Sequence, residues 1–113
     1  MLVLLPPSEG KAPGGTMGPL DLGQLSFPEL TAAREMLVRA LEDLARRRPD
    51  DLLSALDLSE RQRSEVEADA ALTHSRTLPA MRRDTGVLYE ALDYPALTGG
   101  ALRRANASLV GAS

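Results

Sequence analysis

The chain's only lysine lies in a short polar segment that directly follows an apolar run near the N-terminus. Residues 4–11 read Leu-Leu-Pro-Pro-Ser-Glu-Gly-Lys, so a hydroxyl at Ser8 and an ammonium at Lys11 stand three positions apart with Gly10 between them. Both side chains donate hydrogen bonds to phosphate oxygens, and glycine lets the backbone approach a ligand closely. The segment predicts an anion site, and a merely flexible loop is the alternative.

This segment is not a P-loop. The first glycine of that motif is absent, and Ala12 stands where a serine or threonine would hold magnesium. We therefore expect Lys11 to act as a mobile point charge for a phosphate group, with Ser8 as an additional donor.

Apart from Lys11, the positively charged residues are all arginines. Seven of the arginines are clustered, at residues 46–48, 82–83 and 103–104. The first cluster is expected at a helix C-terminus, where positive charge offsets the helix macrodipole. The other two lie near glycines and are better candidates to face a phosphate backbone. Neighbouring helical residues diverge by about 100°, so at most one arginine of each pair would serve one site.

Several kinds of chemistry are excluded or disfavoured by composition. The chain has no cysteine, which excludes disulfide partners and thiolate metal sites, and its single histidine, His74, belongs to no helical histidine and carboxylate motif. We expect neither a metal nor a cofactor. No arrangement typical of an enzyme class is present, so the residues favour a non-enzymatic role and leave an enzyme open.

Charge and hydropathy limit the partners. The net charge of −3 gives no global attraction to nucleic acid, so DNA binding would need a local patch or residues outside this chain. The apolar run at residues 2–5 meets Pro6 and Pro7 long before it reaches the length of a signal peptide or membrane span. We expect a cytosolic protein with no membrane partner. The sequence does not indicate an oligomeric state.

Two apolar runs and several amphipathic segments would position these residues. Residues 2–5 and 107–112 have the character of short buried strands, whereas the glycines and prolines of residues 8–25 predict a long loop. A helix is expected from a capping box at Ser26 and Glu29 to about Pro49. Shorter helices are expected at residues 50–56, from Ser59 to about 72, at 78–81 and at 87–92, with a loop at 73–77 and a break at residues 99–100.

These elements predict a mixed α/β fold, mostly helical, with two short buried strands at about residues 2–5 and 108–112. We expect residues 1–113 to be the N-terminal part of one larger domain. The reason is that a buried strand seldom ends a complete domain without a further element to cover it.

Three segments resemble the YaaA family of peroxide-stress proteins. Residues 2–11 are similar to the opening strand and loop of that family, and residues 25–30 and 85–92 are similar to its next two recurring segments, in the same order. The resemblance covers essentially all of this chain but only about the first half of such a protein. One departure is Asp84, because the family usually has an aromatic residue two positions before Gly86.

The resemblance implies a mixed α/β fold and a cytosolic protein of the response to hydroperoxide that limits damage from free iron. It also implies a positively charged cleft that favours DNA. Transferred to this chain, the residues of the cleft would be Ser8, Lys11 and Tyr89, with Arg83 beside the Gly86 segment.

Three hypotheses from different classes remain. The first is a non-enzymatic DNA-binding stress protein. The second is an enzyme that acts on a phosphorylated or nucleotide-like small molecule, with Lys11 holding an anion and Tyr89 as an acid. The third is a truncated fragment without activity of its own.

Overall fold

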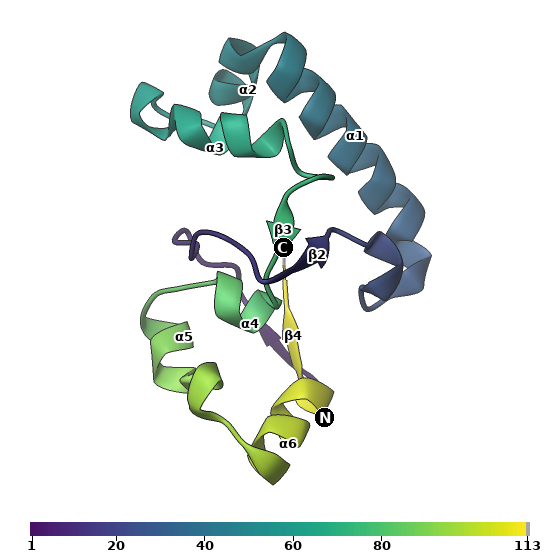
Figure 1. Ribbon diagram of the computed structural model, residues 1–113, viewed down its shortest axis with the longest axis vertical. Helices are drawn as coiled ribbons and strands as arrows, with labels where there is room; N and C mark the ends of the chain where they lie inside the picture. The colour runs from purple at the N-terminus through teal and green to yellow at the C-terminus, as the bar shows by residue number, and fades with distance from the viewer. Residues whose placement is uncertain (113) are drawn as a thin grey trace. The chain divides into compact units, whose positions relative to one another are not determined.

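Two short strands from the two ends of the chain pair in parallel in the computed structural model, which describes residues 1–112 (Figure 1). Strand β1 (Val3–Leu5) pairs with β4 (Leu109–Gly111), with Val3 opposite Leu109 and Leu5 opposite Gly111. The mixed α/β class and both strand positions are as the sequence predicts. The prediction that the first strand is buried is wrong for most of its length, because Leu5 is the only buried residue of β1.

The two most exposed leucines of this sheet lie on the face opposite its buried leucine. Successive side chains of a strand point to opposite faces, so Leu2 and Leu4 lie on the face opposite Leu5, and they are 61% and 69% exposed. Parallel strands are normally covered on both faces. Within residues 1–112 the sheet has two strands, and the described residues leave the face of Leu2 and Leu4 uncovered.

The strand pair belongs to the first of two compact units, which comprises residues 1–16 and the residues from 78 onward. Its helices are α4 (Ala80–Arg83), α5 (Val87–Leu92), the 3-10 turn η4 (Tyr94–Ala96) and α6 (Gly99–Ser108). The two predicted helical turns separated at Gly86 are confirmed as α4 and α5. Gly86 has a φ of 102°, which glycine adopts readily and other residues do not.

The predicted break at residues 99–100 is wrong, because these glycines are the first residues of α6. Gly99 has a φ of 52°, so the chain changes direction there as the helix begins. Glycine weakens a helix interior, but at a helix end this cost is small.

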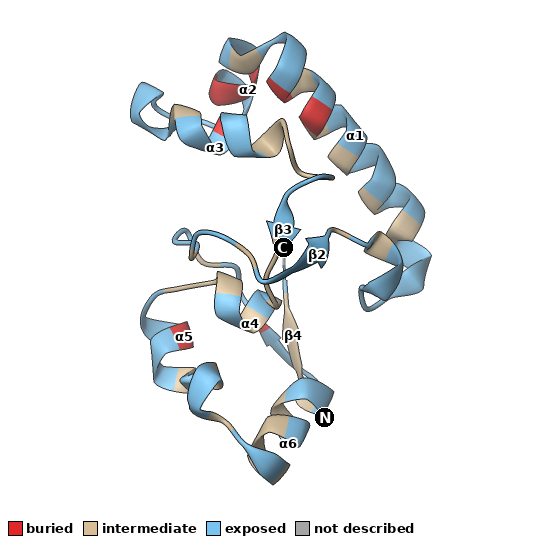
Figure 2. Ribbon diagram, viewed as in Figure 1, coloured by how far each residue is buried: buried red, intermediate tan, exposed pale blue. Residues whose placement is uncertain are grey.

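The second unit, residues 17–77, is a small helical core with a strand pair. Its elements are β2 (Met17–Pro19), η1 (Leu22–Gln24), η2 (Pro28–Leu30), α1 (Thr31–Arg47), α2 (Pro49–Ala55), η3 (Glu60–Gln62), α3 (Arg63–Asp69) and β3 (Arg76–Thr77). Ala45, Leu52, Leu53 and Val66 are buried where α1, α2 and α3 meet (Figure 2). The three predicted helices of this region are therefore present.

A buried carboxylate connects α1 to the segment after α3. Glu42 is 8% exposed and accepts hydrogen bonds from the Thr73 backbone N–H at 2.8 Å and from its hydroxyl at 2.7 Å. The hydrogen bonds from Thr73 hold the pKa of Glu42 below its usual range, although burial opposes the shift. Glu42 therefore remains ionised at neutral pH and fixes the residues that follow α3.

Two loop predictions are wrong. The segment at residues 8–25 contains β2 and η1, and the segment at 73–77 contains β3, which pairs with β2 in antiparallel orientation. The pairing joins residues almost 60 positions apart, so the local glycine and proline content does not reveal it.

The predicted capping box at Ser26 is also absent. Phe27 precedes η2 in a left-handed conformation, with a φ of 62°, and its side chain makes no capping hydrogen bond. The Arg34 guanidinium instead donates to the carbonyls of Ser26 and Phe27. The second predicted cap is confirmed, since the Ser59 backbone N–H donates to Gln62 Oε1 at 3.1 Å.

None of the helices in residues 1–112 combines the length and the apolar character needed to cross a membrane.

Candidate functional site

The loop after β1 lies beside the segment that connects α4 to α5. Lys11 and Asp84 form an isolated antiparallel bridge, the Ala12 N–H donates to the Arg83 carbonyl at 2.7 Å, and the Thr85 N–H donates to the Gly10 carbonyl at 3.1 Å. These backbone contacts bring the polar residues of two segments, more than 70 positions apart in sequence, to the carboxyl end of β1. This is the end of a strand at which α/β proteins usually bind ligands.

Gly10 makes this close approach feasible. A Cβ atom at this position would lie 2.5 Å from Thr85 Oγ1, which is too close for a carbon and an oxygen that are not bonded. The glycine predicted to admit a ligand therefore admits the neighbouring Thr85 side chain.

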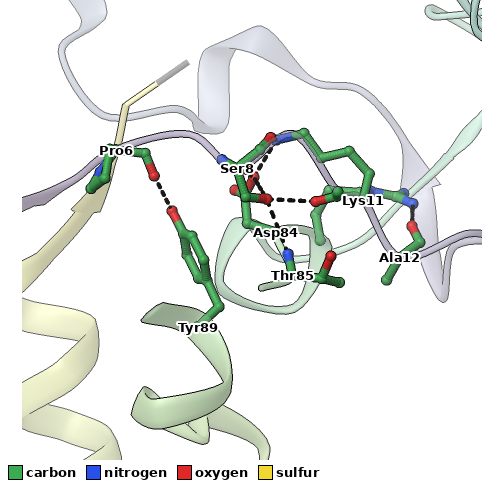
Figure 3. Close-up of polar contacts among 9 residues, drawn as sticks. Pro6, Ser8, Lys11, Ala12, Asp84, Thr85 and Tyr89 are labelled. Carbon is green, nitrogen blue, oxygen red and sulfur yellow. Dashed lines mark hydrogen bonds and ion pairs between the residues drawn. The ribbon is translucent and has the colours of Figure 1, made fainter. Parts of the chain in front are cut away.

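Asp84 is the centre of the polar cluster (Figure 3). Its Oδ1 atom accepts from the Ser8 backbone N–H at 3.2 Å, lies 3.0 Å from Ser8 Oγ, and forms an ion pair with the Lys11 ammonium. The Asp84 side chain is only 10% exposed, whereas that of Lys11 is 44% exposed. The carboxylate therefore lies inside the cluster and the ammonium reaches the surface.

The contacts of Asp84 keep it ionised. Burial alone would raise the pKa of the Asp84 carboxyl, but hydrogen bonds from Lys11 and Ser8 outweigh burial and hold that pKa below its usual range. The charge of Lys11 is thus balanced by a permanent negative charge at neutral pH.

The Lys11 ammonium has a second acceptor within its own loop. Its Nζ donates to the Ser8 carbonyl at 2.7 Å. An ammonium group carries three N–H donors, and Asp84 and Ser8 engage two of them. Lys11 is consequently held in place, whereas the sequence analysis expects it to be mobile.

The Ser8 hydroxyl is surrounded by polar groups. It accepts from the Thr85 N–H at 3.1 Å, and the Gly10 carbonyl and Asp84 Oδ1 both lie within reach of its single proton. The hydroxyl therefore links the two segments.

Tyr89 connects α5 to the end of β1. Its ring is buried, and its hydroxyl donates to the Pro6 carbonyl at 2.6 Å (Figure 3). Burial raises the pKa of the Tyr89 hydroxyl, and the charge of Asp84 raises it further. Tyr89 therefore stays protonated at neutral pH, with its proton directed at the backbone.

Arg83 is held by the same loop, because its guanidinium donates to the Ala12 carbonyl. Its neighbour Arg82 is exposed, as are Arg103 and Arg104 on α6. Of the arginine pairs, Arg83 is the member that contacts the loop of Lys11.

An open pocket of about 350 Å³ adjoins the cluster. It is lined by residues 6–10 of the β1 loop and residues 85–89 at the start of α5. Ser8 and Tyr89 both contribute to its wall, so the polar cluster and an apolar hollow lie side by side.

The four residues singled out from the sequence lie close to this contact: Ser8 and Lys11 in the loop after β1, Arg83 at the end of α4 and Tyr89 in α5. Sequence reasoning missed the role of Asp84 and of Thr85. Asp84 was noted only as a departure from the family pattern, but it is the principal acceptor of the cluster. No pattern within either segment identifies Asp84, because its contacts with Ser8 and Lys11 join positions more than 70 residues apart.

Within residues 1–112, no three histidine, cysteine, aspartate or glutamate side chains gather as metal ligands would. His74 lies exposed after α3, in the second unit.

The chain is similar to bacterial proteins named only as UPF0246 proteins. It is 51% identical to the UPF0246 protein of Corynebacterium efficiens over 104 residues, which cover 92% of this chain and 41% of that relative. It is 48% identical to a Corynebacterium glutamicum relative over the same shares, and 47% identical over 110 residues to the Streptomyces coelicolor protein, covering 97% of this chain and 42% of that relative. The chain thus spans about two fifths of the length of these curated relatives.

No protein-family model matches the chain, and no solved structure matches it.

Proposed function

We propose that this chain is part of a cytosolic DNA-binding protein of the response to hydroperoxide, and that its phosphate contacts lie at the carboxyl end of β1. The observation that carries the binding role is the convergence of Ser8, Lys11 and Arg83 from two separate segments beside an open pocket. Cationic and hydroxyl donors gathered at a strand end suit a phosphate group.

The stress role rests on the resemblance of residues 2–11, 25–30 and 85–92 to the YaaA family. The names of the relatives carry no function beyond the designation UPF0246. Limitation of iron damage follows from the same resemblance, and in this proposal it acts through protection of the bound DNA.

The binding role is tested by measuring the affinity of the chain for a short DNA duplex at several salt concentrations. Each phosphate contact releases counterions, so affinity should fall as salt rises, and Lys11→Ala should reduce the slope of log K against log salt by about 1. Arg39→Ala, which removes one exposed positive charge from α1 in the other unit, is the matched control and should leave the slope unchanged. An affinity that does not depend on salt would contradict the proposal.

The second candidate is an enzyme that acts on a phosphorylated small molecule, and the pocket beside Ser8 favours it. Its volume falls at the lower end of the range typical of small-molecule sites. Titration calorimetry with a nucleoside monophosphate would then show saturable one-to-one binding that Lys11→Ala abolishes. Tyr89 is a poor acid for this role, because its hydroxyl proton is directed at the Pro6 carbonyl.

A further inference from the structure

Three different donor groups converge on one oxygen atom of Asp84. They are a backbone N–H, a hydroxyl and an ammonium, contributed by Ser8 and Lys11, which belong to one four-residue segment of the loop after β1. Proteins use this combination of donors to hold phosphate and carboxylate oxygens of ligands. In this chain, the oxygen that they hold is the chain's own.

We propose that the loop segment at residues 8–11 is an oxyanion site occupied by Asp84 as an internal ligand, and that a phosphate group competes with this carboxylate for Lys11 and Ser8. The inference rests on the proposed function, since it concerns the same site, and it adds that Asp84 restrains binding. The shared ligand chemistry is a phosphate oxyanion, either free in solution or in a nucleic-acid backbone.

The exposures of the two charged groups support this competition. Lys11 reaches the surface, with 44% of its side chain exposed, whereas Asp84 approaches from the interior and is 10% exposed. A phosphate can therefore meet the ammonium from solvent while Asp84 holds it from inside. Because the carboxylate cancels the charge of Lys11, an arriving anion gains little attraction until that contact is released.

A purely structural role is the alternative explanation of the same contacts. In that case, Asp84 fastens the β1 loop to the α4–α5 connection and its charge has no bearing on a ligand. The two explanations predict opposite effects of removing the charge while keeping the shape of the side chain.

The test compares Asp84→Asn with Asp93→Asn. Both replace an aspartate of the same unit by its isosteric amide and change the net charge equally, but Asp93 lies exposed at the end of α5, away from the cluster. Inorganic phosphate and a short DNA duplex are titrated separately into each variant. We expect Asp84→Asn to strengthen phosphate binding roughly fivefold, the effect of a half-exposed ion pair, and Asp93→Asn to leave it unchanged. Combining Asp84→Asn with Lys11→Ala should remove the gain.

A measurement on the unmodified chain guards against a variant that fails to fold. Its Ser8 amide resonance is followed by NMR during a phosphate titration, and it should shift as the N–H exchanges a carboxylate for a phosphate acceptor. The Gly14 amide, in the same unit and outside the cluster, should not shift.

The outcomes separate this inference from the proposed function. Stronger phosphate binding by Asp84→Asn, with no DNA binding by any variant, would support the internal ligand and overturn the DNA-binding role. Lys11-dependent DNA binding that Asp84→Asn leaves unchanged or weakens, with a silent Ser8 amide, would overturn the internal ligand and leave the proposed function standing.

Discussion

Asp84 stands between two short helices in the sequence and accepts from three donor groups in the structure. Because its pKa is lowered in the folded chain, the unfolded state binds more protons as the pH falls through the acid range. The stability that Asp84 contributes is therefore fully present above the pKa of the unfolded chain. It is lost as the pH falls through the pKa of the folded chain.

The corresponding prediction concerns the difference in free energy of unfolding between the unmodified chain and Asp84→Asn. Urea titrations should show a clear difference at pH 7, and the difference should shrink as the pH falls through the lowered pKa of Asp84 in the folded chain, because both chains then carry an uncharged side chain at this position. Comparing the two chains at each pH cancels the effect of other carboxylates such as Glu42. A difference that is constant with pH would mean that the ion pair contributes nothing to stability.

Tyr89 offers a second prediction at this scale. Tyr89→Phe keeps the buried ring and removes the donor to the Pro6 carbonyl, so the free energy of unfolding should fall by about 1 kcal/mol. Tyr94→Phe is the matched control, because its hydroxyl bonds to Asn106 at an exposed position and water can replace it. Equal losses of unfolding free energy in both variants would show that the hydrogen bond of Tyr89 stabilises the chain no more than the exposed one of Tyr94.

At the scale of elements, the close approach of the β1 loop to the α4–α5 connection predicts that Gly10→Ala is destabilising. The added methyl group would lie 2.5 Å from Thr85 Oγ1, and relieving this overlap should cost about 1–3 kcal/mol. Thermal unfolding measures the loss.

The variant Gly10→Ala combined with Thr85→Ala serves as the control for this prediction. Removing the Thr85 hydroxyl opens the space, so the double variant should be more stable than the sum of the two single changes implies. If the losses of stability are additive, the overlap with Thr85 is not the cause of the destabilisation by Gly10→Ala, because the two segments then move apart to accommodate the methyl group.

The elements also show what sequence reasoning can and cannot reach. The helices of residues 31–69 follow from local patterns, since periodic apolar residues and the Ser59 cap act within one or two turns. Strands β2 and β3 do not follow from local patterns, because strands of two or three residues are stabilised by pairing with a partner that is distant in the sequence. The Ser26 cap is absent, and Phe27, which precedes η2, has a left-handed backbone conformation that the local spacing does not show.

The candidate site divides in the same way. Ser8 and Lys11 were found because their segment is unusual in itself. Asp84 was not, because its importance comes from a contact that spans 73 positions. The pattern within one segment therefore identifies the donors, Ser8 and Lys11, but their acceptor, Asp84, is identified only from the folded structure.

At the scale of the whole molecule, the uncovered face of the β1–β4 pair and the length of the relatives favour the proposal that residues 1–113 are the N-terminal part of one larger domain. The side chains of Leu2 and Leu4 are mostly exposed, and the curated relatives are more than twice as long as this chain. The remaining part of such a protein would supply further sheet to cover the two leucines.

This proposal predicts that the 113-residue chain unfolds in urea over a broad range, as followed by circular dichroism. A version extended to the length of the relatives should unfold in one sharper transition at higher urea, because the added residues bury more apolar surface. Leu2→Ser with Leu4→Ser should lower the stability of the extended version and change the short chain little. A sharp transition of the short chain at the same urea concentration would contradict the proposal.

The distribution of aromatic residues gives the molecule a built-in optical label. Both tyrosines lie in the first unit, and residues 17–77 contain no tyrosine and no tryptophan. Tyrosine fluorescence therefore responds to the surroundings of Tyr89 and Tyr94 alone, whereas far-ultraviolet circular dichroism records the helices of both units. Coincidence of the two signals during denaturation would identify a single cooperative unit, and their separation would resolve the order in which the two halves melt, without any added dye.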